Sequence, residues 1–162
     1  MILKELLLNK LKENFPEAEV EMTEYKGEIT YKFDKKFVVE ICKFLRNDEE
    51  FKFLHCADVT AIDWAKRQNR YTVVYHIFSF KNNIRIRLKA DVDESDLRID
   101  SVSSVWKTAN WHERETFDMY GITFNNHPDH RRMYLPEDFE YHPLRKDFPL
   151  MGIPGSLPLP KK

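Results

Sequence analysis

Hydrophobic positions follow helical spacing at the start of the chain and then strand spacing. Residues 2–14 place apolar side chains three and four positions apart, which is typical of an amphipathic helix, and Pro16 follows its end. Residues 28–33 alternate between apolar and polar and predict a short strand. Asp34 is a candidate N-cap for a second helix. The apolar face of that helix comprises Phe37, Val38, Ile41, Phe44 and Leu45.

The middle of the chain predicts three strands. Residues 51–63 read as a strand, and residues 70–80 carry β-branched and aromatic side chains on both faces, as in a central strand covered on both sides. Residues 84–90 alternate apolar and basic side chains, and an Asn-rich turn joins them to the preceding strand as a hairpin. We expect the basic side, Arg85, Arg87 and Lys89, to be a solvated strand face rather than a phosphate site. Residues 91–100 form an acidic connector.

Residues 104–120 predict another helix, with Ser104 as a candidate N-cap and Gly121 as the left-handed residue that ends it. Two sides of this helix mix aromatic residues with carboxylates, which suits a helix packed between its own sheet and a partner.

Proline and glycine mark a change after residue 120. Seven of the eight prolines and three of the four glycines lie from Gly121 onward. The sequence thus predicts an α+β domain over residues 1–120, with a mixed or antiparallel sheet and flanking helices, followed by an extended Pro-rich tail over residues 121–162. The tail keeps many aromatic residues, so we expect it to bind a partner surface and not to be disordered.

Composition narrows the classes of function. The length of 162 residues fits one domain, and 26 basic against 27 acidic residues leave no overall field to attract nucleic acid or an anionic membrane. The N-terminus has no apolar run long enough for a signal peptide, and no stretch approaches the roughly 20 apolar residues of a membrane span. The two cysteines, Cys42 and Cys56, are too few for a four-thiolate cluster and are expected in the core.

Candidate chemistry concentrates in residues 113–150. Glu113, Glu115 and Asp118 could be general acids or metal ligands, but the favoured interpretation is ion pairing with the basic residues of the same stretch. Those basic residues are Arg114, Arg131, Arg132, Arg145 and Lys146.

Four of the six histidines lie in this region or directly before it: His112, His127, His130 and His142. They could be imagined as a zinc site, but their spacing matches no zinc motif, and a structural role is expected. The chain has no GxGxxG, P-loop, GxSxG or HExxH signature.

The same stretch carries a longer signature, preceded by Trp106. Its residues are Trp111, Glu113, Arg114, Glu115, Asp118, Gly121, Phe124, His127, Pro128, Arg131, Arg132, Pro143, Arg145, Lys146, Asp147 and Phe148. In this order they closely resemble the signature of the 30 kDa subunit (the C subunit) of the respiratory NADH:quinone oxidoreductase, complex I. Two departures stand out: His130 occupies a position that is usually apolar in the family, and the chain ends soon after the signature.

The resemblance implies a non-redox subunit of the peripheral arm of a proton-translocating complex, with no catalytic residue, cofactor or metal of its own. FMN and iron–sulfur clusters would lie on other subunits and carry electrons from NADH to quinone. Partners would be the hydrogenase-like large subunit, near the quinone site, and other peripheral-arm subunits, with no nucleic acid. Membrane contact would come only through the complex, at the cytoplasmic face of the inner membrane. The signature residues are expected at the partner interface or in structural roles.

Three alternatives stay open at the level of sequence. One is the equivalent subunit of a membrane-bound hydrogenase or ferredoxin-linked complex. The second is a free-standing metal-dependent enzyme that uses His127, His130 or His142. The third is an interaction module whose partner has no redox centre.

Overall fold

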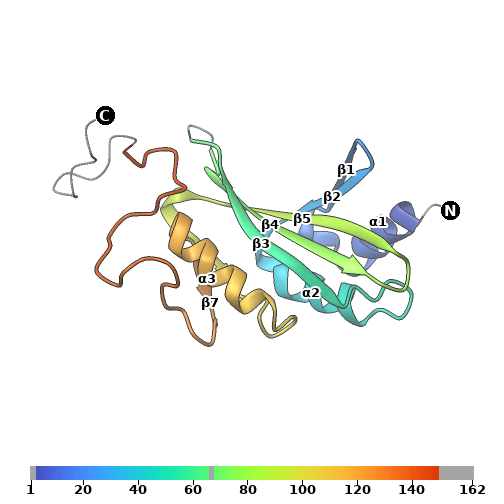
Figure 1. The fold of residues 1–162 in the computed structure, drawn as a ribbon. Coiled ribbons are helices and arrows are strands. Elements are labelled where there is room, and N and C mark those ends of the chain that lie inside the picture. The colour runs from blue at the N-terminus through green and yellow to red at the C-terminus, as the bar shows by residue number, and fades with distance from the viewer. Residues whose placement is uncertain (1–2, 66–67, 150–162) are drawn as a thin grey trace.

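A five-stranded sheet with helices along one side forms the body of the computed structural model, which describes residues 3–65 and 68–149 (Figure 1). The strands are β1 (Glu21–Tyr25), β2 (Glu28–Phe33), β3 (His55–Asp63), β4 (Tyr71–Ser79) and β5 (Ile84–Val92). They lie in the order β1-β2-β5-β4-β3. The pair β2 and β5 is parallel, and the other neighbours are antiparallel. The sheet is therefore mixed, and the predicted α+β fold class is confirmed.

The helices and short elements complete the described part of the chain. The α-helices are α1 (Leu3–Asn14), α2 (Val38–Asn47) and α3 (Ala109–Tyr120), and the 3₁₀ turns are η1 (Pro16–Ala18), η2 (Lys35–Phe37) and η3 (Glu94–Asp96). Strands β6 (Arg98–Asp100) and β7 (Thr123–Asn125) form a separate parallel pair. The sequence patterns did not predict β1, β6 or β7, because β1 is largely exposed and the other two strands are only three residues long.

The core lies between the helices and one face of the sheet. Alternate residues of β4 and β5, such as Tyr75, Ile77 and Leu88, are fully buried there. The basic residues of β5 lie on the opposite face, where Arg85 contacts Glu28 at 2.6 Å, so the predicted solvated face is confirmed. Within the described residues the helices cover only one face of β4 (Figure 1), but Thr72 and Val74 on its other face are also buried, so the expectation of a strand covered on both sides is confirmed for the first part of β4.

Helix α3 begins five residues later than predicted. Residues 101–108 form turns, and Ser104 is not its N-cap. Trp106 therefore lies outside the helix; it is buried, and its Nε1 donates to the Phe53 carbonyl at 3.0 Å. The end of the helix is as predicted, because Gly121 adopts φ +75° and donates to the Phe117 carbonyl.

The segment 126–149, which we call the strap, follows β7 and runs back along α3 (Figure 1). It has turns but no helix or strand. Since residues 123–125 form β7, the domain extends past the predicted boundary at residue 120. The part of the predicted tail after residue 149 lies outside the described residues.

Candidate functional site

Asp118 holds the first half of the strap. Its side chain is fully buried on α3, and Oδ1 accepts from Arg132 Nη1 at 2.6 Å. Oδ2 accepts the backbone N–H groups of Met133, Tyr134 and Leu135 at 3.1, 2.7 and 3.0 Å. These donors and the guanidinium favour the charged form, and they lower the pKa of Asp118 although burial acts in the opposite direction. The predicted pairing of this carboxylate with an arginine is confirmed.

Glu113 lies inside the domain with a different set of partners. Its Oε1 accepts the Val102 N–H at 2.7 Å, and its Oε2 contacts Ser101 Oγ at 2.5 Å. No arginine pairs with it among the described residues, so the expected ion pair is wrong for this carboxylate. Burial raises the pKa of Glu113 to about 7, against the lowering effect of the Ser101 and Val102 hydrogen bonds. The same bonds fold residues 101–103 back onto the helix.

Arg114 joins α3 to the strap through backbone carbonyls. Its Nε donates to the Arg131 carbonyl at 3.1 Å and its Nη2 to the Arg132 carbonyl at 3.2 Å. The guanidinium also lies 4.9 Å from the centre of the Trp111 ring and 3.4 Å from Asp129. Arg114 is thus buried by its own chain, whereas Trp111 stays 59% exposed.

Gly121 allows the second half of the strap to approach the end of α3. A Cβ at this position would meet the Arg145 guanidinium and would lie 2.6 Å from His142 Nε2. Arg145 Nε donates to the Tyr120 carbonyl at 2.6 Å, and the Leu144 N–H donates to the Met119 carbonyl at 3.1 Å. The glycine of the signature therefore serves close backbone packing as well as the positive φ.

The far end of the strap rests on an ion pair that the sequence analysis did not single out. Arg70 forms a bidentate pair with Asp63 at 2.9 and 2.8 Å, and its Nη1 also contacts Asp147 at 3.0 Å and Glu94 at 2.6 Å. Asp63 additionally accepts the Lys146 N–H at 2.8 Å. These contacts lower the pKa of Asp63 to about 2, with the Arg70 hydrogen bonds as the main cause. A signal was present, because Asp63 ends β3 and Arg70 precedes β4 across one hairpin turn.

Histidines of the strap bind backbone groups of this chain. His127 Nδ1 accepts the Asp129 N–H at 3.1 Å, and its Nε2 lies 3.0 Å from the Asn110 carbonyl. His142 Nδ1 lies 2.9 Å from the Asp118 carbonyl. His130 Nε2 accepts a backbone N–H of β7. No three His, Cys, Asp or Glu side chains converge as a metal site within residues 3–65 and 68–149.

The remaining signature residues divide between the interior and the surface. Phe124 is buried on β7, and Phe148 and Pro143 are half-buried. The side chain of Glu115 is half-buried and makes no ion pair or hydrogen bond with the described residues. The side chains of Pro128, Arg131, Lys146 and Asp147 are exposed, and Arg131 contacts Asp129 at 2.5 Å.

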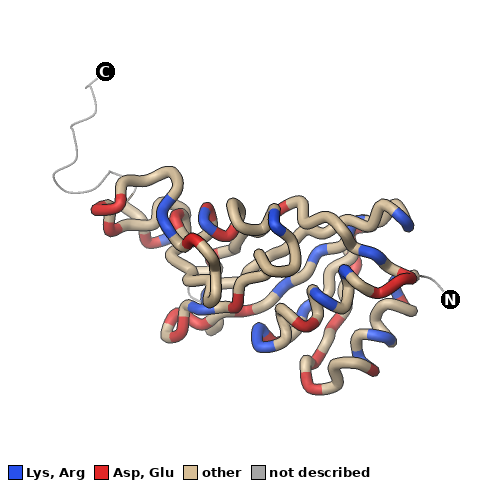
Figure 2. Tube along the Cα trace, turned by 90° about the horizontal axis from the view of Figure 1, so that it is seen from below, with Lys and Arg blue, Asp and Glu red and all other residues tan. Residues whose placement is uncertain are grey.

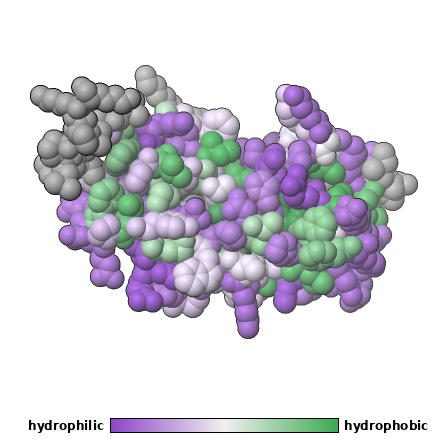
Figure 3. All heavy atoms as spheres, in the orientation of Figure 1, coloured by the Kyte–Doolittle hydropathy of each residue, from purple (hydrophilic) through white to green (hydrophobic). Residues whose placement is uncertain are grey.

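Large apolar side chains remain on the outside of this braced structure. Figure 3 shows apolar residues gathered over α3 and the strap, interrupted by hydrophilic ones. The exposed large side chains there are Trp111 at 59%, Tyr134 at 63%, Tyr141 at 40% and Leu144 at 51%. Three of these four residues are aromatic, and we call the four together the aromatic face. Charges of both signs are interspersed along the described part of the chain, including the strap (Figure 2).

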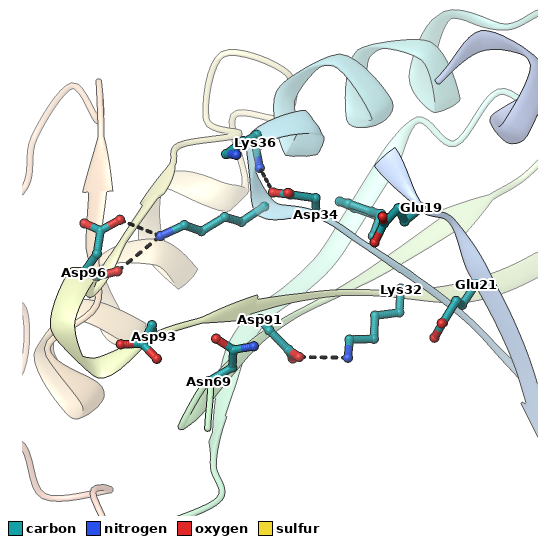
Figure 4. A pocket seen from close by; sticks show the side chains of 11 residues that line it. Glu19, Glu21, Lys32, Asp34, Lys36, Asn69, Asp91, Asp93 and Asp96 are labelled. Carbon is teal, nitrogen blue, oxygen red and sulfur yellow. Dashed lines mark hydrogen bonds and ion pairs between the residues drawn. The ribbon is translucent and has the colours of Figure 1, made fainter. Parts of the chain in front are cut away.

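A separate hollow of about 430 Å³ lies between β1, β2, η2 and the connection after β5 (Figure 4). Lys32 pairs there with Asp91 at 2.8 Å, and Lys35 pairs with Asp96 at 2.7 Å. Its charges thus neutralise one another in part, and no strap residue lines it.

The cysteines and the lengths of the helices concern two further features, a reactive thiol and a membrane span. Cys42 and Cys56 are both free and buried, and burial raises the pKa of the Cys56 thiol to about 12. Neither thiol is activated as a nucleophile at neutral pH. In the part of the chain that the structure describes, no helix has the length and apolar character needed to span a bilayer.

Comparison with known proteins places this geometry in a family. Residues 31–154 match the family described as respiratory-chain NADH dehydrogenase, 30 Kd subunit. The chain is 47% identical over 144 residues to the C subunit of NADH-quinone oxidoreductase from Geobacter sulfurreducens, covering 88% of each chain. It is 45% identical over 150 residues to the same subunit from Geobacter metallireducens, covering 92% of this chain and 91% of the relative.

Two solved structures share the fold. The trypsin-resistant fragment of Nqo5 matches with a TM-score of 0.64 and 25% identity, covering 76% of this chain and 98% of the fragment. A chain of an archaeal membrane-bound sulfane sulfur reductase matches with a TM-score of 0.72 and 20% identity, covering 91% of this chain and 86% of its own length. The second likeness concerns the fold alone.

The homologues are named as subunits of NADH-quinone oxidoreductase. This chain is therefore of the class of subunits that form multi-subunit respiratory complexes. More closely, the chain belongs to the 30 kDa subunit family of the respiratory NADH dehydrogenase, complex I.

Proposed function

We propose that this chain is a non-redox subunit of the peripheral arm and that its aromatic face docks on the hydrogenase-like large subunit of complex I, near the quinone site. The observation that carries this proposal is the exposure of Trp111 on α3 and of Tyr134, Tyr141 and Leu144 on the strap, while Arg132 and Asp147 of the strap form ion pairs within the chain. Tryptophan and tyrosine are the residues that most often dominate binding energy at protein interfaces.

The internal bracing of the strap supports docking as a preformed surface. Asp118 binds the strap near its middle, and Asp63 with Arg70 binds its far end. Ordering a backbone residue costs about 1–2 kcal/mol, so a strap that is already ordered avoids much of that cost on association. The arginines of the signature would thus act mainly within this chain, and the exposed aromatic side chains would meet the partner.

In this proposal the chain itself performs no electron transfer. FMN and iron–sulfur clusters on other subunits carry electrons from NADH to quinone, and the chain supports that path by holding the large subunit in place. The chain would lie at the cytoplasmic face of the inner membrane, beside the large subunit and other peripheral-arm subunits, with membrane contact only through the complex. Interspersed charge gives no support for nucleic-acid binding.

The identities of the relatives favour NADH and quinone over hydrogen or ferredoxin. Both Geobacter relatives are named as a subunit of NADH-quinone oxidoreductase, whereas the sulfane sulfur reductase is similar to this chain in fold alone. The activity of the purified complex distinguishes these possibilities directly.

The experiment compares matched pairs of surface substitutions in the tagged full chain, purified gently from its native membranes. Tyr134→Ser and Leu144→Ser alter the aromatic face, while Tyr25→Ser and Leu54→Ser alter side chains of the same types that are 73% and 54% exposed elsewhere. We expect the first pair to reduce co-purification of the large subunit at least about tenfold, as for interface hot spots, and the second pair to leave it unchanged. Equal recovery for both pairs would refute docking through the aromatic face.

NADH:quinone activity provides the second readout of the same preparations. The proposal expects activity to fall in proportion to the complex recovered, because the chain contributes assembly and no chemistry. Normal assembly with lost turnover in Glu115→Ala would instead indicate a direct role near the quinone.

A further inference from the structure

His130 attaches the first part of the strap to the small parallel sheet. Its Nε2 accepts the Phe124 N–H of β7 at 2.9 Å, and its ring packs against Phe117 of α3 with 4.1 Å between centroids. A ring nitrogen that accepts an N–H hydrogen bond carries no proton. In the closed strap the imidazole is therefore neutral, with its proton on Nδ1.

The surroundings of His130 offer little to stabilise a second proton. Its ring neighbours are Phe117, Phe124 and the imidazole of His127, whose centroid is 5.7 Å away. His127 Nδ1 accepts the Asp129 N–H at 3.1 Å. Burial and the proximity of His127 both lower the pKa of His130.

The charged groups around this cluster are already engaged with other partners. Glu113 of α3 is separated from His130 by His127, whose Nε2 lies 3.8 Å from its carboxylate. Asp129 of the strap binds Arg131 at 2.5 Å and Arg114 of α3 at 3.4 Å. His142 of the strap packs against Phe117 with 6.3 Å between centroids and is bound to the Asp118 carbonyl.

We propose that His130 makes closure of the strap sensitive to acid: the strap lies on α3 and β7 only while this imidazole is neutral, and protonation releases it there. A protonated ring would turn an N–H toward the Phe124 N–H, so the buried amide would lose its acceptor and two donors would face each other. The preference for the open strap then grows as pH falls, because the open form binds one more proton.

The sign and size follow from proton linkage. The pKa of His130 is lowered in the closed form from its ordinary value of 6.5. The neutral ring therefore stabilises the closed form fully at pH values above 6.5, and this stabilisation is lost as the pH falls from 6.5 toward the lowered pKa. Within that window the ratio of closed to open strap decreases by at most about tenfold per pH unit. The inference concerns this chain alone and does not depend on the identity of a partner.

The test is amide hydrogen exchange of the full chain from about pH 7.5 to pH 5.5. His130→Gln keeps an acceptor oxygen near the Nε2 position but cannot titrate, and His55→Gln is a control at an exposed histidine of β3. Comparing proteins at each pH removes the intrinsic pH dependence of exchange. We expect equal protection of residues 124–135 at pH 7.5 and several-fold faster exchange in the wild type than in His130→Gln at pH 5.5.

Parallel exchange profiles of the wild type and His130→Gln at every pH would overturn the proposal. If His130→Gln fails to close at any pH, an NMR titration of the wild type decides. The Phe124 amide signal should then follow the titration of the His130 ring, at a pH below 6.5. A ring that titrates without moving the Phe124 amide would overturn the inference in the same way.

Discussion

Glu113→Gln provides a test of the buried carboxylate in α3. The glutamine oxygen can still accept the Val102 N–H, and its NH2 group can donate to Ser101 Oγ. Both hydrogen-bond partners of Glu113 are therefore kept, with the direction of the Ser101 hydrogen bond reversed. What the substitution removes is the ability to ionise. The comparison therefore isolates the cost of placing a charge at a fully buried position.

The magnitude follows from the raised pKa of Glu113. Burial raises it from 4.5 to about 7, and one pKa unit corresponds to about 1.4 kcal/mol. Below about pH 4.5 the carboxyl is protonated in both folded and unfolded chains and makes no difference. As pH rises from about 4.5 to 7 the unfolded chain ionises first, so the folded state loses about 3 kcal/mol of stability, and above pH 7 the loss is complete.

The assay is urea unfolding of the purified wild type and Glu113→Gln between about pH 5 and pH 8. We expect the free energy of unfolding of the variant, relative to wild type, to rise by about 2.5 kcal/mol over this range, since a smaller part of the full effect is already present at pH 5. Titrating groups that do not contact Glu113, including His130, are shared by both proteins and cancel in the difference. Glu115→Gln, on the same helix but without a partner among the described residues, should show a difference within about 0.5 kcal/mol. A difference for Glu113→Gln that does not change with pH would refute the reasoning.

Three further substitutions test the bracing of the strap, by urea unfolding or by amide hydrogen exchange near neutral pH. Asp118→Asn should lower the free energy of unfolding by about 3 kcal/mol, because an asparagine oxygen can still accept the strap N–H groups but its NH2 group then faces the Arg132 guanidinium and the buried ion pair is lost; an unchanged midpoint would contradict this role. Gly121→Ala should cost at least about 1 kcal/mol at φ +75° and should also displace Arg145, which faster exchange of the Leu144 amide would reveal. Arg70→Lys loses the bidentate contact with Asp63, so we expect local opening at residues 146–147 with little global change; protection equal to wild type would show that this pair does not hold the strap.

Sequence patterns located most elements because their signals are local. The spacing of apolar residues in α1 and the alternation in β5 depend on neighbours within a few positions, and both elements lie where the pattern predicted. Gly121 ended α3 as expected, since a left-handed residue is a local requirement. The start of the same helix was misplaced because Glu113 draws the Ser101–Val102 backbone into a turn, which is a contact across eleven residues.

The sequence predicted which residues belong to the candidate site, but it did not predict which of them pair with one another. The signature residues do gather around α3 and the strap, and Asp118 does pair with Arg132. The predicted role of the strap at a partner surface stays a prediction. The contacts of Glu113 with Val102 and of Asp63 with Lys146 could not have been assigned, because these partners are backbone N–H groups, which every residue except proline carries.

The sequence by itself therefore determined the α+β class, most elements and the resemblance to the signature of the 30 kDa subunit, all of which are written in short-range spacing and residue type. The tertiary structure alone decided that the strap is braced by its own domain, that Arg70 holds its end, and that His130 faces a β7 amide. Arg70 and Asp147 are separated by 77 residues. Such contacts depend on how the sheet and helix bring distant segments together, and no local pattern encodes that distance.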